Sequence, residues 1–132
     1  MSEENVARAR HAYRHYNDTG ELPDEFLHPD VVWHTPADIP ERVILRGREA
    51  VRRHISGYAR SFDDYRVEPR EILDAGDQVV ACVLLSGRIK GTESRVELAA
   101  AQVFRVSRDG RAIEVHEYRT KAEALEAAGL RE

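Results

Sequence analysis

Apolar residues in the first half of the chain recur with the period of an α-helix. The spacing of four of them predicts an amphipathic helix, which the polar run at residues 17–20 ends: Val6, Ala9, Tyr13 and Tyr16. A second stripe predicts a helix over residues 48–61, formed by Val51, Ile55, Tyr58 and Phe62. Between the two helices we expect one helical turn at residues 23–27, a short strand at residues 31–35 and a loop at residues 37–45.

The second half of the chain changes to longer apolar runs separated by turn signals. These runs predict four strands, at residues 65–73, 78–89, 95–107 and 112–119. Pro69 marks the first of them as an edge strand or a bulge, because proline lacks the N–H that a central strand donates. Residues 121–128 predict a short helix, and Gly129 follows where a C-terminal glycine cap belongs. Helices followed by a run of strands predict an α+β fold rather than an alternating parallel one.

Composition narrows the class of protein. The chain has 132 residues, of which 42% are hydrophobic and 33% charged, and this balance suits one globular domain. Its single cysteine, Cys82, lies in an apolar run and cannot form an internal disulfide. The net charge of −4 argues against a nucleic-acid partner. No apolar leader and no apolar run of membrane length is visible, so we expect a cytoplasmic protein with no membrane partner.

The turn between the last two predicted strands sets their register. A two-residue hairpin turn at Asp109 and Gly110 pairs Arg108 with Arg111. The register that follows matches apolar residues with apolar residues and a base with an acid, in the pairs Val106–Ile113, Phe104–Val115 and Arg105–Glu114. A slip by one residue would turn every side chain to the other face of the sheet. The agreement therefore supports this pairing.

The same register sets Gln102 directly opposite Glu117 on the apolar face. The β-carbons of directly opposed residues lie about 4.5–5.5 Å apart, so we expect an amide and a carboxylate to touch inside an apolar concavity. A carboxyl group in such surroundings is suited to proton transfer. Two other interpretations stay open: Glu117 as a core acid satisfied by Gln102 and a backbone amide, or Glu117 as a partly hydrated residue at the sheet rim.

Three stretches of the chain are similar to one protein family. They are residues 26–31, residues 45–51 and residues 109–130, the last of which includes the hairpin turn and Glu117. On these residues the chain resembles the SnoaL-like group of the nuclear transport factor 2 superfamily over nearly its whole length. The resemblance implies a single domain, residues 1–132, in which a cystatin-like, cone-shaped, curved antiparallel sheet is packed by N-terminal helices around a pocket. It also implies a small hydrophobic molecule as the ligand and a homodimer packed through the outer sheet face.

Three enzyme branches of that family carry their chemistry at positions that can be compared with this chain. The chain resembles limonene epoxide hydrolases at Glu117, but Val83 and Leu85 stand where that branch has an arginine and a second aspartate. Ketosteroid isomerases have their base where Thr35 stands and a protonated acid where Gln102 stands. Polyketide cyclases have an acid comparable to Glu117, together with a histidine that has no clear counterpart here. The chain therefore departs from each of the three arrangements.

The predicted site combines a catalytic pair with a surrounding wall. Glu117 is expected to move a proton or position a water molecule, and Gln102 is expected to hold a substrate oxygen. The expected ligand-binding wall consists of Tyr16, Trp33, Thr35, Tyr58 and Phe62.

Of the histidines, only His54 is a secondary candidate for the pocket, because it flanks the apolar stripe of the second helix. His11 and His15 are spaced i, i+4 but lie off the apolar stripe of the first helix, on a solvated face.

The resemblance implies that Trp33 and Thr35 face the pocket, so strand alternation turns His34 outward. His116 shares the outward parity of Glu114. The sequence therefore predicts no metal ion and no organic cofactor.

Three functions remain open at this point. The first is an isomerase, cyclase or hydrolase that acts on a small hydrophobic carbonyl, epoxide or polyketide-type molecule through Glu117. The second is a ligand-binding sensor or carrier without chemistry, which the missing triad and the missing first-strand base favour. The third is a dimerisation module whose pocket is vestigial, which a cavity plugged by Trp33 and Tyr58 would favour.

Overall fold

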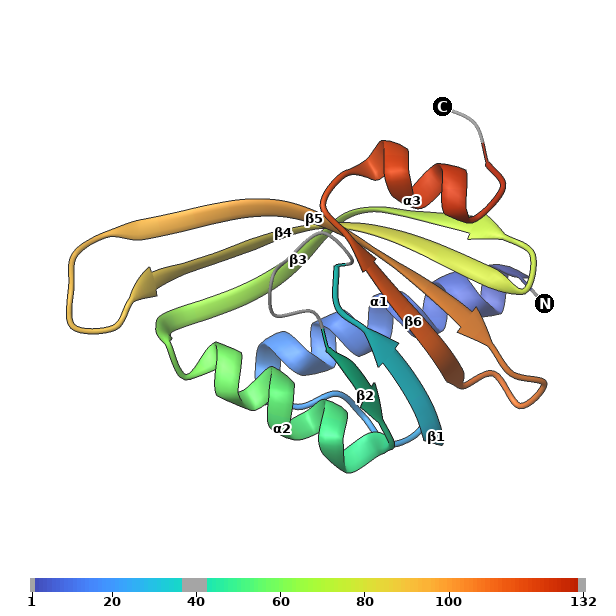
Figure 1. Ribbon diagram of the computed structural model, residues 1–132, viewed down its shortest axis with the longest axis horizontal. Helices are drawn as coiled ribbons and strands as arrows, with labels where there is room; N and C mark the ends of the chain where they lie inside the picture. Colours follow the sequence, from blue (N-terminus) through green and yellow to red (C-terminus); the bar gives the residue numbers. More distant parts are fainter. Residues whose placement is uncertain (1, 37–42, 131–132) are drawn as a thin grey trace.

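One six-stranded sheet, in the order β2-β1-β6-β5-β4-β3, organises the molecule. The computed structural model describes residues 2–36 and 43–130. Its elements are α1 (Ser2–Thr19), β1 (Leu27–His34), β2 (Ile44–Arg46), α2 (Arg48–Ala59), β3 (Phe62–Ala75), β4 (Gln78–Ile89), β5 (Arg95–Val106), β6 (Ala112–Tyr118) and α3 (Lys121–Ala127). The sheet is curved, with α1 and α2 on one side and α3 on the other (Figure 1). The predicted α+β class with a curved sheet is confirmed.

The two faces of the sheet bury separate apolar clusters. The larger cluster lies between α1 and the concave face of the sheet, and its fully buried members include Leu27, Val31, Val51, Val79 and Val115. The smaller cluster lies under α3, and its buried members are Val80, Ala101, Val103, Ala124 and Leu125. Neighbouring residues of one strand therefore serve different clusters, as the two-residue alternation of a strand requires.

The expected helical stripe of α1 is confirmed, whereas that of α2 needs a correction. Tyr13 and Tyr16 of α1 are buried against the sheet. The helix α2 ends at Ala59, so Phe62 does not continue its stripe but begins β3, opposite Ile89. This position is possible because a Cβ atom added to Gly87 would lie only 3.0 Å from the Phe62 Cβ atom. The missing side chain of Gly87 makes room for Phe62 on the sheet.

The segment between the first two helices differs in part from the expected turn, strand and loop. Phe26 closes a turn through its backbone N–H to the Pro23 carbonyl, but β1 already begins at Leu27. Residues 37–42 of the expected loop lie outside the described residues. The end of that loop is wrong, because β2 begins at Ile44 and pairs with β1.

The resemblance implied a wholly antiparallel sheet, but the observed sheet is mixed. β1 pairs with β6 in parallel, with Trp33 opposite Val115 and His34 opposite His116. A hairpin can only join antiparallel strands, whereas β1 and β6 are separated by most of the chain and are free to run the same way. The prediction that Pro69 marks an edge strand or a bulge is confirmed. The strand β3 lies at the edge of the sheet, and its register shifts between Pro69 and Glu71.

The hairpin between β5 and β6 has a longer loop than expected. The Ser107 N–H bonds the Arg111 carbonyl at 2.8 Å, and the Gly110 N–H bonds the Ser107 carbonyl at 3.0 Å. Val106 consequently faces Ala112, so the predicted pair Val106–Ile113 is wrong. A register shift between Arg105 and Val106 compensates for the additional loop residue. The pairs beyond this shift, Arg105–Glu114 and Phe104–Val115, are therefore as predicted.

No helix within the described ranges is both long enough and apolar enough to span a membrane.

The hairpin turn gives a first test. Gly110 has a φ of 86°, a conformation that costs an L-residue about 1–2 kcal/mol. Replacement of Gly110 by alanine should therefore lower the free energy of unfolding in urea by at least that amount, because the added Cβ atom would also force the Arg8 guanidinium to move aside. Gly57→Ala is the matched control, because Gly57 lies within α2 with no atom near its added Cβ and should instead gain about 0.5–1 kcal/mol. Equal effects of the two substitutions would contradict the turn geometry.

Candidate functional site

A hydrogen bond joins Gln102 of β5 to Glu117 of β6 on the concave face of the sheet. The two residues are directly opposed in the antiparallel ladder. The side-chain amide Nε2 of Gln102 donates to Oε2 of Glu117 at 3.1 Å. Both side chains are half-buried. The contact that the hairpin register predicted is therefore confirmed.

Tyr13 of α1 completes this pair as a chain of three residues. Its hydroxyl donates to Oε1 of Gln102 at 2.5 Å. Tyr13 is only 5% exposed, and burial, together with the nearby negative charge of Glu117, raises its pKa well above the usual value. The phenol thus stays protonated and donates, which fixes the Gln102 oxygen toward Tyr13 and its NH₂ group toward Glu117. The helical spacing identified Tyr13 as a core residue but gave no sign of this bond.

Four aromatic rings lie together beside this hydrogen-bond chain, centred on a residue that the sequence did not single out. Tyr65 of β3 has its ring centroid 6.4 Å from Tyr16, 5.7 Å from Tyr58 and 5.4 Å from Phe62. Burial raises the pKa of Tyr65, and the neighbouring tyrosines and Glu117 act in the same direction. Three members of the predicted wall are thus brought together around Tyr65.

Tyr58 is the most exposed member of this aromatic group. Its side chain is 45% exposed, so it lies at the edge of the group rather than filling the centre. This exposure gives no support to the hypothesis of a pocket plugged by Trp33 and Tyr58.

The two predicted wall residues of the β1 segment have different surroundings. Trp33 is 3% exposed and meets the Phe104 ring edge-on, with centroids 6.3 Å apart. Its indole Nε1 is buried and finds no hydrogen-bond acceptor among the described residues. The Thr35 hydroxyl, in contrast, accepts from the Val43 N–H at 2.8 Å and donates to the Val43 carbonyl at 3.1 Å. Thr35 therefore ties its segment to the residue before β2.

Two apolar side chains of β4, Val83 and Leu85, stand at the positions that the sequence resemblance sets against the charged residues of the epoxide hydrolase branch. Val83 pairs with Ala100, and Leu85 pairs with Leu98. Because Gln102 is opposite Ala81, alternation places Val83 and Leu85 on the same concave face as Gln102. The concave face therefore supplies apolar surface here, with no charged partner for Glu117 from either position.

A small surface hollow lies away from Glu117. It has a volume of about 10 Å³, which is room for roughly one water molecule. Its lining consists of Gly20, Glu21, Leu22, Arg52, Ile55 and Ser56. None of the predicted site residues belongs to this hollow, so it has no part in the candidate site.

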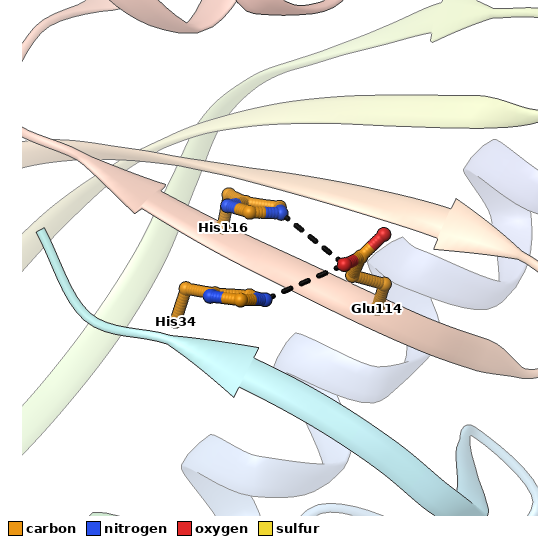
Figure 2. Close-up of side chains that lie close together, drawn as sticks. All are labelled: His34, Glu114 and His116. Atoms are coloured by element: carbon orange, nitrogen blue, oxygen red, sulfur yellow. Dashed lines mark ion pairs between the residues drawn. The ribbon is translucent and has the colours of Figure 1, made fainter. Parts of the chain in front are cut away.

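The opposite face of the sheet carries a cluster that could hold a metal ion: His34, Glu114 and His116 (Figure 2). The outward direction predicted for both histidines is confirmed, because they share the face of Glu114. Burial acts to raise the pKa of Glu114, but the Arg105 guanidinium and the two imidazoles outweigh it and hold that pKa below the usual range. The sequence gave no sign of the cluster, because it did not reveal that β1 lies beside β6.

Comparison with known proteins identifies the family. A family model described as a SnoaL-like domain matches residues 8–115. The chain belongs to the SnoaL-like family, and the resemblance expected from the sequence is confirmed. A search of curated proteins gives no significant match.

Solved structures of the same fold cover almost the whole chain. Bal32a, from a soil-derived mobile gene cassette, shares 22% identity with a TM-score of 0.77 and 96% coverage of each chain. A candidate SnoaL-like polyketide cyclase from Jannaschia sp. CCS1 shares 18% identity with a TM-score of 0.74, over 97% of this chain and 92% of its own. SalBIII, an epoxide hydrolase/cyclase-like enzyme of pyran ring formation in salinomycin, shares 16% identity with a TM-score of 0.71, over 91% and 93%. At such identities the likeness establishes the fold.

The Tyr13 hydroxyl gives the second test. Tyr13→Phe keeps the ring but removes the donor to Gln102, which leaves a part-buried amide oxygen unsatisfied. We expect the free energy of unfolding to fall by about 1–3 kcal/mol in urea denaturation. Tyr16→Phe is the control, since Tyr16 is equally buried but makes no hydrogen bond to the described residues through its hydroxyl, and it should change stability little. A neutral Tyr13→Phe would show that the bond does not form.

Proposed function

We propose that the protein binds a small hydrophobic molecule on the concave face of its sheet and acts on it by acid–base chemistry at Glu117. The reaction class is isomerisation, cyclisation or hydrolysis of a carbonyl, epoxide or polyketide-type substrate. The observation that carries the proposal is the hydrogen-bond chain from Tyr13 through Gln102 to Glu117.

This chain supports Glu117 as the group that moves a proton. A general base must lie within hydrogen-bond reach of the proton it takes, so its orientation has to be fixed. Gln102 holds the Glu117 carboxylate through a neutral amide, and Tyr13 in turn fixes that amide. The carboxylate is thereby positioned by an uncharged partner.

Two N–H donors on the concave face, one from Gln102 and one from Trp33, support the binding of ligand oxygens. An amide group carries two N–H donors. One N–H of Gln102 donates to Glu117, and we expect the other to donate to a substrate carbonyl or epoxide oxygen. The buried indole N–H of Trp33 finds no acceptor among the described residues, and a buried donor left unpaired is costly. A ligand oxygen within its reach would remove that cost.

The aromatic group supports a hydrophobic ligand. Tyr16, Tyr58, Phe62 and Tyr65 offer ring faces and edges beside the hydrogen-bond chain. Binding sites for small molecules are typically built in this way, from apolar and aromatic walls with a few placed polar groups. The family match over residues 8–115 agrees with one such domain along the chain.

Binding without chemistry is the second candidate function. It is favoured by Val83 and Leu85, which put apolar side chains where the epoxide hydrolase branch has its arginine and second aspartate. A carrier or sensor would use the same aromatic group and the same oxygen-binding donors, and Glu117 would then serve only as a hydrogen-bond acceptor.

Exchange of α-protons in heavy water separates these two functions. The probe is 2-tetralone, a bicyclic ketone whose α-protons a carboxylate can remove, and deuterium uptake is followed by mass spectrometry. We expect the protein to accelerate uptake, and we expect Glu117→Gln to reduce the rate constant by about 10²–10⁴-fold, the usual contribution of a general base. Fluorescence of Trp33, the single tryptophan, reports binding, which the variant should retain.

The control variant is Glu97→Gln, which changes an exposed acid on β5 and should leave exchange unchanged. Equal exchange by wild type and Glu117→Gln would contradict the catalytic role. Quenching of Trp33 without any exchange in either protein would favour the binding function.

A further inference from the structure

Three potential metal ligands meet on the outer face of the sheet, opposite the candidate site. His34 of β1 lies directly opposite His116 of β6 in the parallel pair. Glu114 precedes His116 by two residues and therefore shares its face. Figure 2 shows both imidazoles turned toward the Glu114 carboxylate. The potential ligand atoms of the three side chains all lie within 4.8 Å of one another.

The distances from the two histidine Nε2 atoms to Oε2 of Glu114 are longer than ordinary hydrogen bonds and close to the spacing of neighbouring ligands around a shared metal ion. The Nε2 atoms of His34 and His116 lie 3.4 Å and 3.5 Å from Oε2 of Glu114, longer than the usual hydrogen bond of about 2.7–3.2 Å. Zinc binds nitrogen and oxygen at about 2.0–2.1 Å, so neighbouring ligands of a tetrahedral zinc ion lie about 3.3 Å apart. The two distances match the edges of such a tetrahedron.

His34 has unused coordinating capacity. Its side chain is only 16% exposed, and neither ring nitrogen makes a hydrogen bond to any described residue. A buried imidazole without hydrogen bonds is costly. A metal ion bound at Nε2 would give that nitrogen a closer partner than the Glu114 carboxylate, which lies 3.4 Å away.

Arg105 orients the carboxylate of this cluster. Its Nε and Nη2 atoms donate to Oε1 of Glu114 at 3.1 Å and 3.0 Å. The other oxygen, Oε2, is the one that faces both histidines. This arrangement matches the outer partners that orient carboxylate ligands in metal sites.

We propose that His34, His116 and Glu114 form a binding site for a divalent transition metal ion of the zinc class. The ligands are Nε2 of each histidine and Oε2 of Glu114, and water completes the coordination. Two imidazoles with one carboxylate suit zinc, cobalt or iron(II). Calcium and magnesium prefer all-oxygen ligand sets, so they are not expected to bind here. The site lies on the opposite face from Glu117 and does not depend on the proposed acid–base function.

Metal binding requires a small movement of the two rings. The imidazoles of His34 and His116 are stacked, with centroids 4.0 Å apart and planes 5° apart. Their Nε2 lone pairs are therefore nearly parallel and do not yet converge. Each ring must therefore rotate about its Cβ–Cγ bond when the ion binds, with the strand register unchanged.

Titration of metal-free protein with zinc chloride, followed by calorimetry, tests the site. We expect saturable binding of one ion per chain at this cluster. His116→Ala and Glu114→Gln should each weaken binding at least tenfold, since loss of an outer partner alone costs about 10–100-fold. Cobalt chloride adds a spectroscopic readout, because tetrahedral cobalt absorbs visible light and the band should disappear in both variants. Thermal unfolding in EDTA checks that each variant is folded.

The matched control is the double substitution His11→Ala with His15→Ala. His11 is exposed and His15 is half-buried; their rings lie on α1 with centroids 6.1 Å apart and offer the competing zinc site. The double variant should bind zinc and cobalt as the wild type does. Loss of the ion in this control, unchanged binding by folded His116→Ala and Glu114→Gln, or no saturable binding by the wild type would overturn the proposal.

Discussion

The hydrogen bond between Gln102 and Glu117 is the contact on which the candidate site depends. It exists because β5 and β6 pair in a single register, and because an irregularity next to Arg105 absorbs the extra residue of the hairpin loop. Tyr13 extends the contact to α1, so the helix and the two strands hold one amide in a defined orientation. A shift of one residue in the register would send the acid to the other face of the sheet.

Strand β6 contributes to both proposed sites through the alternation of its side chains. Glu117 and Val115 point to the concave face, whereas Glu114 and His116 point outward on either side of Val115. The surroundings of the two acids follow from their directions. Glu117 accepts a hydrogen bond from a neutral amide, while Glu114 meets a guanidinium and two imidazoles. One strand of seven residues thus supplies a candidate base on one face and candidate metal ligands on the other.

Local patterns explain which features could be predicted from the sequence. The helix α1, the strand β4 and the Gln102–Glu117 pair were all predicted, because each rests on periodicity or on a short hairpin. The loop was misjudged because an Asp-Gly pair fits both a two-residue turn and a longer one with glycine at positive φ. The parallel pairing of β1 with β6 joins distant segments and leaves no local signal. The outer cluster and the central place of Tyr65 depend on such distant contacts and were therefore missed.

The most direct test of the central contact is a double-mutant cycle on the free energy of unfolding. The cycle compares Gln102→Ala, Glu117→Ala and the double variant with the wild type in urea denaturation. If the side chains bond as described, the two changes should be non-additive, with a coupling energy of about 0.5–3 kcal/mol. Effects that add to within about 0.3–0.5 kcal/mol would mean that the residues do not interact, and would contradict the account of the candidate site.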